Sequence, residues 1–449
     1  MTPEAGRTRA RPKRTTRVKA EVAPRPDERP KAVLPPIEDL IAAARPPGWE
    51  PEPEAARPEP EPAPPADPTS AHLATPDELE DWDARAVASL HGHVYQSREW
   101  ANYRAAHGWR AWPIAFDDGF RLLVIGRPTG DRDAGAAYAS RGPIPEADPQ
   151  VTALRAAAAA EILEAEGLAS LTVDGETPVG SGLGAHLEAA GFAPTDEEQV
   201  SRHRMDVQLG PDDTPNSDEK TIFGSFGATT RNAIRQAERH GLTVRRLDAG
   251  GGRLEEEYGS TELAEFEQVE PYDAGAMDAM LQTFYGMLGS AARNSSFALT
   301  SEDRFVDWSR RAIAAGHMLY LQAEHQEDGP IAGAAFYRHG HRLTYALAGD
   351  RTEERRKYPG AVPLLVWRGI QIGLDERRTN IDLGGVDTRG DRRKPDKGDP
   401  TYGPYQFRES FGARWLELTG AHRRTMRPTS QKVGKVAARA LRLLGRTAR

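Results

Sequence analysis

The feature that most limits what this chain can fold into is the concentration of proline at its start. Residues 1–70 contain 17 of the 35 prolines and few aliphatic or aromatic side chains. Repeats such as Pro58-Glu59-Pro60-Glu61-Pro62 favour an extended, polyproline-like chain, because such a segment cannot bury enough apolar surface to form a core. We therefore expect residues 1–75 to form a disordered leader, which leaves about 370 residues, enough for two domains of ordinary size.

Helix and strand patterns recur in a similar order in the two halves of this remaining chain. The second half ends in a helix, a strand, a hairpin strand, a further strand, a helix and a last strand, an order that resembles the N-acetyltransferase (GNAT) fold. These segments are Glu302–Ala315, Met318–Glu324, Ile331–Tyr337, Leu343–Ala348, Val362–Arg378 and Asn380–Leu383. The first half, with a helix over Thr152–Glu166 and a strand over Ala169–Val173, is a shorter version of the same unit.

The predicted fold class is therefore α/β (α+β), with two tandem acetyltransferase-like (GNAT) domains. We expect the first domain over residues 76–218, completed by about residues 413–427, and the second domain over residues 219–412. Residues 428–449 are predicted as a basic tail, whose apolar positions suit a short amphipathic helix lying on a membrane.

The composition excludes several kinds of chemistry. The chain has no cysteine, which excludes disulfides, thiolate metal sites and cysteine nucleophiles. No apolar run reaches the length of about 18–20 residues that a membrane span needs, and the basic start lacks the apolar core of a signal peptide. We expect a cytoplasmic monomer.

The net charge of −8 hides an uneven distribution. Residues 1–20 carry +6 and residues 422–449 carry +9, so the rest of the chain carries −23. The simpler interpretation is that both ends are solvated tails. The alternative is contact with a polyanion, either RNA phosphates or the anionic inner leaflet of the membrane.

The predicted helix over Thr229–His240 carries three arginines on one face. Arg231, Arg235 and Arg239 are spaced i, i+4 and i+8, so their charges repel one another unless an anion or an acidic side chain answers them. The simpler interpretation is a solvated basic face with local acids. The functional interpretation is an anion-binding face.

Two further segments combine glycine with groups suited to acyl transfer. Tyr402–Gly412 holds four aromatic residues and Arg408, and a fixed cation there could stabilise the oxyanion of a tetrahedral intermediate or hold a phosphate. The alternative is a loop-to-strand joint that packs its rings into the core and leaves Arg408 exposed. Leu383–Asp387 is a strand that runs into two glycines, which indicates either close approach by a ligand or a bulge at the strand end.

Other motifs carry little weight. The pairs His91 with His93 and His339 with His341 lack a third ligand, so no metal site is expected. Arg356–Ala361 occupies the place of an acetyltransferase pyrophosphate loop, but proline and bulky residues replace much of its glycine-rich backbone.

Taken together, the segments resemble the FemABX family of non-ribosomal peptidyl transferases over about residues 90–425. The matching segments follow one another in chain order: Gln96-Ser97-x-x-Trp100-x-x-x-Arg104, Tyr138-x-x-Arg141-Gly142-Pro143, Arg231-Asn232-x-Ile234-Arg235-x-Ala237-Glu238, Phe284-Tyr285-x-x-Leu288, Arg293-x-x-x-Phe297, Tyr345-Ala346-x-Ala348-Gly349, Trp367-x-x-Ile370, Asp382-x-Gly384-Gly385-Val386, and Tyr405-x-Phe407-Arg408-x-x-Phe411-Gly412. No long helical hairpin interrupts the second half, so the resemblance is to the compact, FemX-like form.

The resemblance implies two GNAT-like domains and the transfer of an amino acid from aminoacyl-tRNA to the stem-peptide amine of a peptidoglycan precursor. That precursor would be lipid-linked (lipid II) or nucleotide-linked (UDP-MurNAc-pentapeptide), the product an interpeptide bridge, and no cofactor would be needed. Implied substrate-binding residues are Arg104 and Arg293 at the diphosphate, and Phe297 and Tyr345 along the peptide groove. Tyr138, Arg141, Tyr405 and Phe407 are further candidates for substrate binding. Implied tRNA-binding residues are Arg231, Arg235, Arg239 and Arg408.

Three positions depart from the family pattern. Arg104 and Arg408 stand where many members have lysine, which replaces a point cation by a planar fork. Phe297 stands where an aromatic hydroxyl would be expected, which removes one hydrogen bond.

For the chemistry itself, an ester is already activated, so the enzyme must mainly orient it and stabilise negative charge. Arg408 is the candidate for that charge, and Asp382 and Asp387 are candidates to deprotonate or orient the amine. The alternatives are an acyl-CoA-dependent GNAT N-acyltransferase, tRNA-dependent amide formation on a secondary metabolite, and a non-catalytic RNA- or membrane-binding protein.

Overall fold

A computed structural model of the chain describes residues 67–127, 135–198, 202–210, 218–249, 266–269, 274–294, 299–386 and 393–427. Most of the expected leader and the basic tail lie outside these residues. The strand β1, Ala71–Leu73, pairs with the first sheet, so the folded part begins before residue 76. Among the described helices, none is long and apolar enough to cross a membrane.

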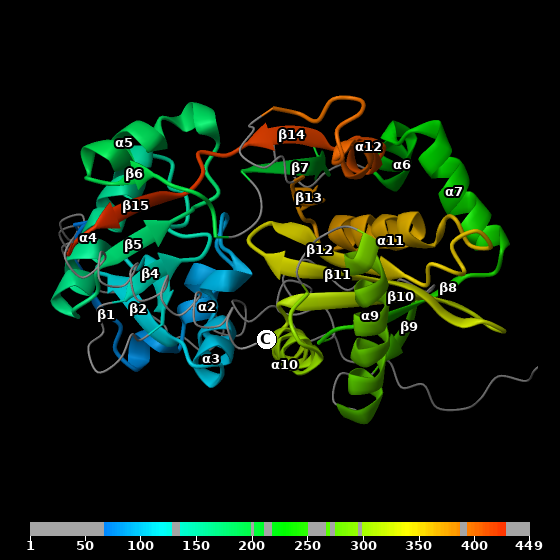
Figure 1. Ribbon diagram of the computed structural model, residues 1–449, viewed down its shortest axis with the longest axis horizontal. Helices are drawn as coiled ribbons and strands as arrows, with labels where there is room; N and C mark the ends of the chain where they lie inside the picture. Colours follow the sequence, from blue (N-terminus) through cyan, green and yellow to red (C-terminus); the bar gives the residue numbers. More distant parts are fainter. Residues whose placement is uncertain are drawn as a thin grey trace, which may run out of the picture. The chain divides into compact units, whose positions relative to one another are not determined.

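The first sheet has seven strands in the order β1-β2-β3-β4-β5-β15-β6 (Figure 1). Its other strands are β2 Arg110–Phe116, β3 Arg121–Gly126, β4 Ala136–Ala139, β5 Ser170–Val173, β6 Ala193–Pro194 and β15 His422–Thr425. The helices of this part are α2 Trp82–Ala86, α3 Arg98–Ala106, α4 Pro149–Ala165 and α5 Leu183–Ala189, with short 3₁₀ turns at Asp77–Leu79, Val94–Gln96 and Val179–Ser181. As its sequence predicts, α3 begins after Ser97, whose side chain accepts a hydrogen bond from the backbone N–H of Trp100.

The second sheet has eight strands in the order β14-β7-β13-β12-β11-β10-β8-β9. They are β7 His203–Gln208, β8 Thr243–Leu247, β9 Phe266–Val269, β10 Met318–His325, β11 Gly329–His339, β12 Arg342–Asp350, β13 Asn380–Asp382 and β14 Arg414–Glu417. Its helices are α6 Glu219–Ser225, α7 Ala228–Arg239, α9 Ala274–Asn294, α10 Glu302–Ala314, α11 Ala361–Asp375 and α12 Tyr402–Glu409.

Both sheets contain the same crossover, in which a helix connects two parallel strands. In the first sheet α4 connects β4 to β5, and all four residues of β4 pair with β5. In the second sheet α11 connects β12 to β13, but only Arg342–Thr344 of β12 pair with β13. Beyond Thr344, β12 continues for six residues past Asp382, the last residue of β13. The two tandem GNAT-like domains predicted from the sequence are thus present, with strands of different length at the crossover.

The sheet boundaries differ from the expected domain boundaries in two places. The strand β7 lies within the range expected for the first domain, yet it pairs with β13 and β14 of the second sheet. The strand β14, expected to complete the first domain, also belongs to the second sheet, and only β15 returns to the first. Figure 1 shows β15 between β5 and β6.

The two sheets share one hydrophobic cluster. It joins Trp82, Trp100 and Ile125 of the first domain to Phe284 and Trp308 of the second. The Trp100 and Trp308 rings lie 4.8 Å apart with their planes at 76°. Burial of these large rings stabilises the junction between the domains.

Candidate active site

Arg408 is a cation held in place by backbone carbonyls. Its Nε donates to the carbonyl of Leu383 at 2.7 Å, and its Nη1 donates to the carbonyl of Pro404 at 2.9 Å. Within the described residues, no carboxylate lies close enough to Arg408 to form an ion pair. Burial lowers the pKa of Arg408, while Tyr345 and Asp382 oppose that shift. The site therefore contains a fixed, partly buried positive charge with no acidic partner.

The surrounding segment is helical, which corrects the alternative of a loop-to-strand joint. In α12, Tyr405 points to the core, where it is buried and its hydroxyl donates to Glu409 at 2.6 Å. Phe407 instead lines a cavity, described below. Of the two aromatic residues of α12 that were predicted to bind substrate, Phe407 therefore lines the cavity and Tyr405 packs in the core.

The turn after β13 faces Arg408. Gly384 has φ = 77°, a conformation that favours glycine. A Cβ atom at Gly384 would lie 3.8 Å from Nη2 of Arg408 and 3.6 Å from the carbonyl oxygen of Tyr345. A Cβ would make only ordinary van der Waals contacts at these distances, so the backbone conformation, and not lack of space, is what favours glycine here.

Asp382 precedes this turn and is only 3% exposed. Its Oδ1 accepts a hydrogen bond from the N–H of Gly384 at 2.7 Å. Burial raises the pKa of Asp382, and the neighbouring Asp206 raises it further, whereas Arg204 lowers it. The second candidate, Asp387, lies outside the described residues.

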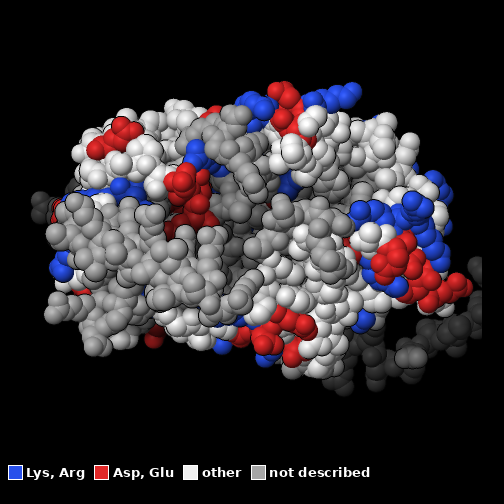
Figure 2. Space-filling view, in the orientation of Figure 1, with Lys and Arg blue, Asp and Glu red and all other residues white. Residues whose placement is uncertain are grey.

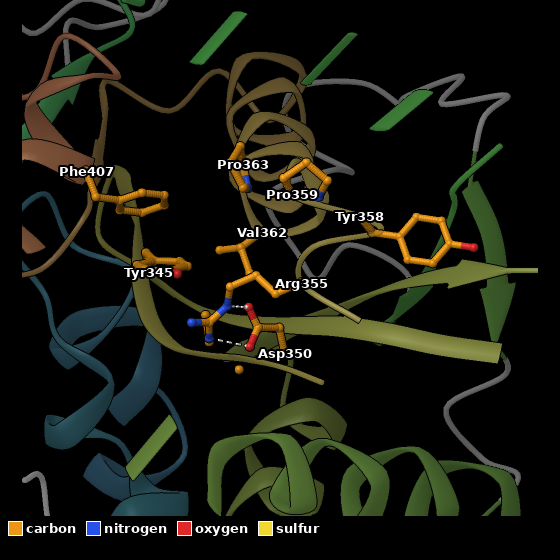
Figure 3. A pocket seen from close by; sticks show the side chains of 10 residues that line it. Tyr345, Asp350, Arg355, Tyr358, Pro359, Val362, Pro363 and Phe407 are labelled. Atoms are coloured by element: carbon orange, nitrogen blue, oxygen red, sulfur yellow. Dashed lines mark hydrogen bonds and ion pairs between the residues drawn. The ribbon is translucent and has the colours of Figure 1, made fainter. Parts of the chain in front are cut away.

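A cavity of about 390 Å³ lies beside the part of β12 that extends past β13 (Figure 3). Figure 3 shows the side chains of Tyr345 and Phe407 next to each other at its edge, and Asp350 joined to Arg355. Nε and Nη2 of Arg355 donate to the two carboxylate oxygens of Asp350 at 2.8 and 2.6 Å. The other lining residues are Ala348, Gly349, Tyr358, Pro359, Val362 and Pro363.

The start of α11 borders this cavity but offers few hydrogen-bond donors. Pro363 has no N–H, and the N–H of Ala361 donates to the carbonyl of Tyr358 at 3.2 Å. Gly360 packs so closely on α7 that a Cβ there would lie 2.0 Å from the carbonyl oxygen of Ala233. Two of the four N–H groups that a helix start normally presents to an anion are therefore lost.

In the first domain, Tyr138 and Arg141 converge on Asp174. The Tyr138 hydroxyl donates to the Asp174 carboxylate, and the backbone N–H of Arg141 donates to the same group at 2.5 Å. Arg141 has φ = 56°, a strained conformation for a non-glycine residue. Burial raises the pKa of Asp174 to about 7, although Arg141 opposes the shift.

Glu176 connects these residues to the second domain. It lies 3.7 Å from Arg141 of the first domain and 3.5 Å from Arg204 of β7, and it also pairs with Arg342 of β12. Burial alone would raise the pKa of Glu176, but Arg342 and the other cations hold it well below its usual range. The sequence analysis missed Glu176, Arg204 and Arg342, because ion pairs between residues 166 positions apart leave no local pattern.

Arg104 and Arg127 form a basic cluster around Trp109 in the first domain. The guanidinium of Arg104 lies 3.6 Å from the ring centroid of Trp109, and that of Arg127 lies 4.9 Å from the same centroid. Burial lowers the pKa of Arg104 to about 10, and repulsion from Arg127 and Arg304 adds to the shift. The Nε of Arg104 is buried without a hydrogen-bond partner. Of the other predicted precursor contacts, the Arg293 side chain and Phe297 lie outside the described residues.

The helix α7 begins next to the end of α12, where Thr230 donates to the Ser410 hydroxyl at 2.8 Å, and the contacts of its three arginines differ. Arg231 donates to the carbonyls of Gly224 and Phe226, and Arg235 lies over the ring of Phe223 at 5.3 Å. Arg239 is exposed. Figure 2 shows acidic side chains beside basic ones on this side of the molecule.

Comparison with known proteins gives matches among solved structures. No protein-family model matches the chain, and no curated protein matches it. The crystal structure of FemX is similar to this chain with a TM-score of 0.63 and 17% identity, over 82% of this chain and 99% of FemX. The structure of L-PGS from Bacillus licheniformis gives a TM-score of 0.44 at 13% identity, over 84% of this chain and 98% of that one. We draw no conclusion from this weaker similarity. The predicted resemblance is thus confirmed at the level of the fold: the chain has the FemX fold, with two tandem GNAT-like domains.

Proposed function

We propose that the protein transfers an amino acid from aminoacyl-tRNA to the stem-peptide amine of a peptidoglycan precursor. The observation that carries the proposal is Arg408, a cation fixed by two carbonyls, free of an acidic partner among the described residues and bordered by a glycine turn. A cation held by carbonyl oxygens keeps its positive charge uncompensated. Such a charge, next to a cavity and a glycine turn, is suited to a negative charge that develops during a reaction, such as the oxyanion of ester aminolysis.

The adjacent cavity supports an acyl donor on this side of the protein. It extends from Tyr345 and Phe407 beside Arg408 to the start of α11. A donor bound there would place its ester carbonyl near the cation. The terminal nucleotide of the tRNA would lie along the part of β12 beyond Thr344.

The start of α11 favours tRNA over acyl-CoA as the donor. Binding of a pyrophosphate there relies on several backbone N–H groups at one helix start. Pro363 and the bond from Ala361 remove two of them. Arg408 and the α7 arginines are the proposed contacts to the acceptor end of the tRNA.

The first domain supports an anionic acceptor. Arg104, Arg127 and Trp109 combine positive charge with an aromatic surface, and guanidinium groups are suited to binding phosphate oxygens. Lipid II and UDP-MurNAc-pentapeptide share the diphosphate that such a cluster would bind. Tyr138, Arg141 and Tyr345 would then border the path of the stem peptide toward Arg408.

The reaction releases one proton overall. The acceptor ammonium loses a proton, its nitrogen forms the amide bond, the ester C–O bond breaks, and the leaving ribose oxygen takes the second nitrogen proton. We propose Asp382 as the group that accepts the first proton, directly or through one water. Its raised pKa makes it a better base than an ordinary aspartate.

The test is incubation of the full-length protein with a pool of charged tRNA and, in separate arms, lipid II, UDP-MurNAc-pentapeptide and a free amine. A parallel set replaces charged tRNA by acetyl-CoA. Mass analysis of the stem peptide should show the addition of one or more amino acids in a tRNA-dependent arm. Acetylation in the acetyl-CoA arms, without aminoacyl transfer, would contradict the proposal.

The basic ends supply a further part of the proposal. The +9 charge of residues 422–449 suits peripheral contact with anionic lipids at the inner face of the membrane, where lipid II is found. Sedimentation with vesicles of anionic and of neutral lipid should show binding to the anionic vesicles only. A variant truncated after residue 427 should lose this binding to anionic vesicles.

A further inference from the structure

A chain of hydrogen bonds runs from a loop of the first domain to the candidate proton acceptor in the second. It begins at the carbonyl of Gly92, which lies 2.9 Å from Nδ1 of His339. The Nε2 of His339 lies 2.9 Å from Oγ1 of Thr344, and Oγ1 of Thr344 lies 3.4 Å from Oδ2 of Asp382. Asp382 in turn accepts from the N–H of Gly384, beside Arg408.

The sheet register explains why these side chains meet. Thr344, Asp382 and Asp206 are direct partners on β12, β13 and β7, so their side chains point to the same face of the sheet. Two carboxylates directly opposite each other repel. Protonation of one of them relieves this repulsion.

The order of donors in the chain follows from its first link. A carbonyl oxygen can only accept, so Nδ1 of His339 carries the hydrogen and its Nε2 is a bare acceptor. Burial keeps His339 neutral, because it holds the pKa of the ring well below its usual range. Thr344 has a single hydroxyl hydrogen, which it can give to His339 or to Asp382 but not to both.

The chain therefore has two arrangements that differ by one proton. When Asp382 is ionised, Thr344 donates to the carboxylate and Nε2 of His339 has no donor from Thr344. When Asp382 is protonated, it donates to Thr344, and Thr344 donates to His339. Taking up a proton thus adds one hydrogen bond to the buried chain.

We infer that Thr344 and His339 are positioning residues of the transfer reaction, and that they favour the proton-bearing form of Asp382. This inference rests on the proposed function only for its link to catalysis, because the hydrogen-bond chain is a property of the protein itself. Other charged groups also face Asp382: Asp206 and Arg204 from β7, Arg342 from β12, Glu176 from the first domain and Arg408 from α12. These groups stay in place in the variants below.

Three variants separate this role from packing. In Thr344→Val the hydroxyl is lost at nearly constant shape, and in His339→Phe the acceptor is lost while a ring remains next to His93. Thr344→Ser keeps the hydroxyl and serves as the conservative control. One hydrogen bond is worth about 0.5–1.5 kcal/mol, and His339→Phe removes only the bond that forms when Asp382 is protonated. This variant should therefore shift the titration of Asp382 to lower pH by about 0.4–1 unit. Thr344→Val removes hydrogen bonds from both forms of Asp382, so its shift should be smaller. Thr344→Ser should leave the titration of Asp382 unchanged.

The measurement is an NMR titration of full-length protein labelled at the aspartate carboxyl carbon, with the Asp382 resonance assigned by Asp382→Asn. The acid limb of kcat/KM against pH, measured with the same variants, should shift in the same direction. An unchanged Asp382 titration in Thr344→Val and His339→Phe would overturn the inference even if aminoacyl transfer is observed. A shifted titration in a protein without transfer activity would support the chain and contradict the proposed function.

Discussion

The two domains contain the same strand–helix–strand crossover, but the two strands have equal length in only one of them. In the first domain β4 pairs with β5 along its whole length, and the space after the strands is filled by Tyr138, Arg141 and Asp174. In the second domain β12 continues past the end of β13 after Thr344, and a cavity of about 390 Å³ lies beside this part of β12. The proposed function assigns the donor to this cavity and the charged groups of the acceptor to the first domain.

The largest expected effect concerns the core that the two domains share. Trp308 donates from its indole Nε1 to the Tyr337 hydroxyl at 2.8 Å and packs against Trp100. Trp308→Ala should lower the free energy of unfolding by about 3–5 kcal/mol, because it leaves a cavity at the junction. Urea unfolding measures this, with the exposed residue Leu154 as control. If Trp308→Ala were no more destabilising than Leu154→Ala, the two domains would not depend on a common core.

The next effect concerns the crossover of the first domain. The pKa of Asp174 is raised to about 7, so the folded protein binds a proton that the unfolded chain releases near pH 4. The stability from this group is fully present below about pH 4 and is lost as the pH rises through about 7. Asp174→Asn keeps an acceptor for Arg141 but cannot ionise.

Unfolding measured from pH 4 to pH 8 should therefore lose stability with rising pH in the wild type, by roughly 2 kcal/mol after allowance for coupling to Arg141. The loss should be clearly smaller in Asp174→Asn. Identical pH profiles would show that Asp174 is ionised in the folded protein.

The cavity beside β12 in the second domain offers a more specific test. Ala348 lines the cavity, so Ala348→Trp should fill part of it and raise KM for the aminoacyl donor by about tenfold or more. KM for the acceptor should stay within about twofold of the wild type. Ala185→Trp, on the exposed side of α5, is the matched control. An equal rise in both KM values would contradict a separate donor site.

The smallest effect concerns the basic cluster of the first domain. Trp109→Leu removes the ring that holds Arg104 and Arg127, so KM for the diphosphate-bearing acceptor should rise by about three- to tenfold. Trp109→Phe retains a ring and should show a smaller rise. If instead KM for the donor changed most, the assignment of the two substrates to the two domains would be reversed.

Local sequence patterns predicted much of the fold. The cap at Ser97, the crossover helix α11 and the glycine turn at Gly384 each follow from residue types within a few positions. The helix α12 did not, because Gly403 and Pro404 suggest a loop. Pro404 falls in the first turn of α12, where its missing N–H costs nothing.

The candidate site could be predicted only in part. Arg408, Asp382, Tyr345 and Phe407 lie in recognisable motifs, and the structure brings them together. Glu176, Arg342 and the pair Thr344 and His339 escaped prediction, since their partners come from the other domain or from a neighbouring strand. Such contacts depend on sheet register and domain packing, which a single sequence does not specify.

The most direct test of the account is the kinetics of Arg408→Gln with an aminoacyl-tRNA donor. The account predicts that kcat falls by about 100- to 1000-fold, as for loss of an oxyanion-stabilising donor, while the melting temperature and the acceptor affinity stay unchanged. Arg408→Lys should be intermediate, because the charge remains but the second carbonyl contact is lost. A wild-type kcat in Arg408→Gln, in a folded protein that transfers amino acids, would contradict the claim that this fixed cation serves the reaction.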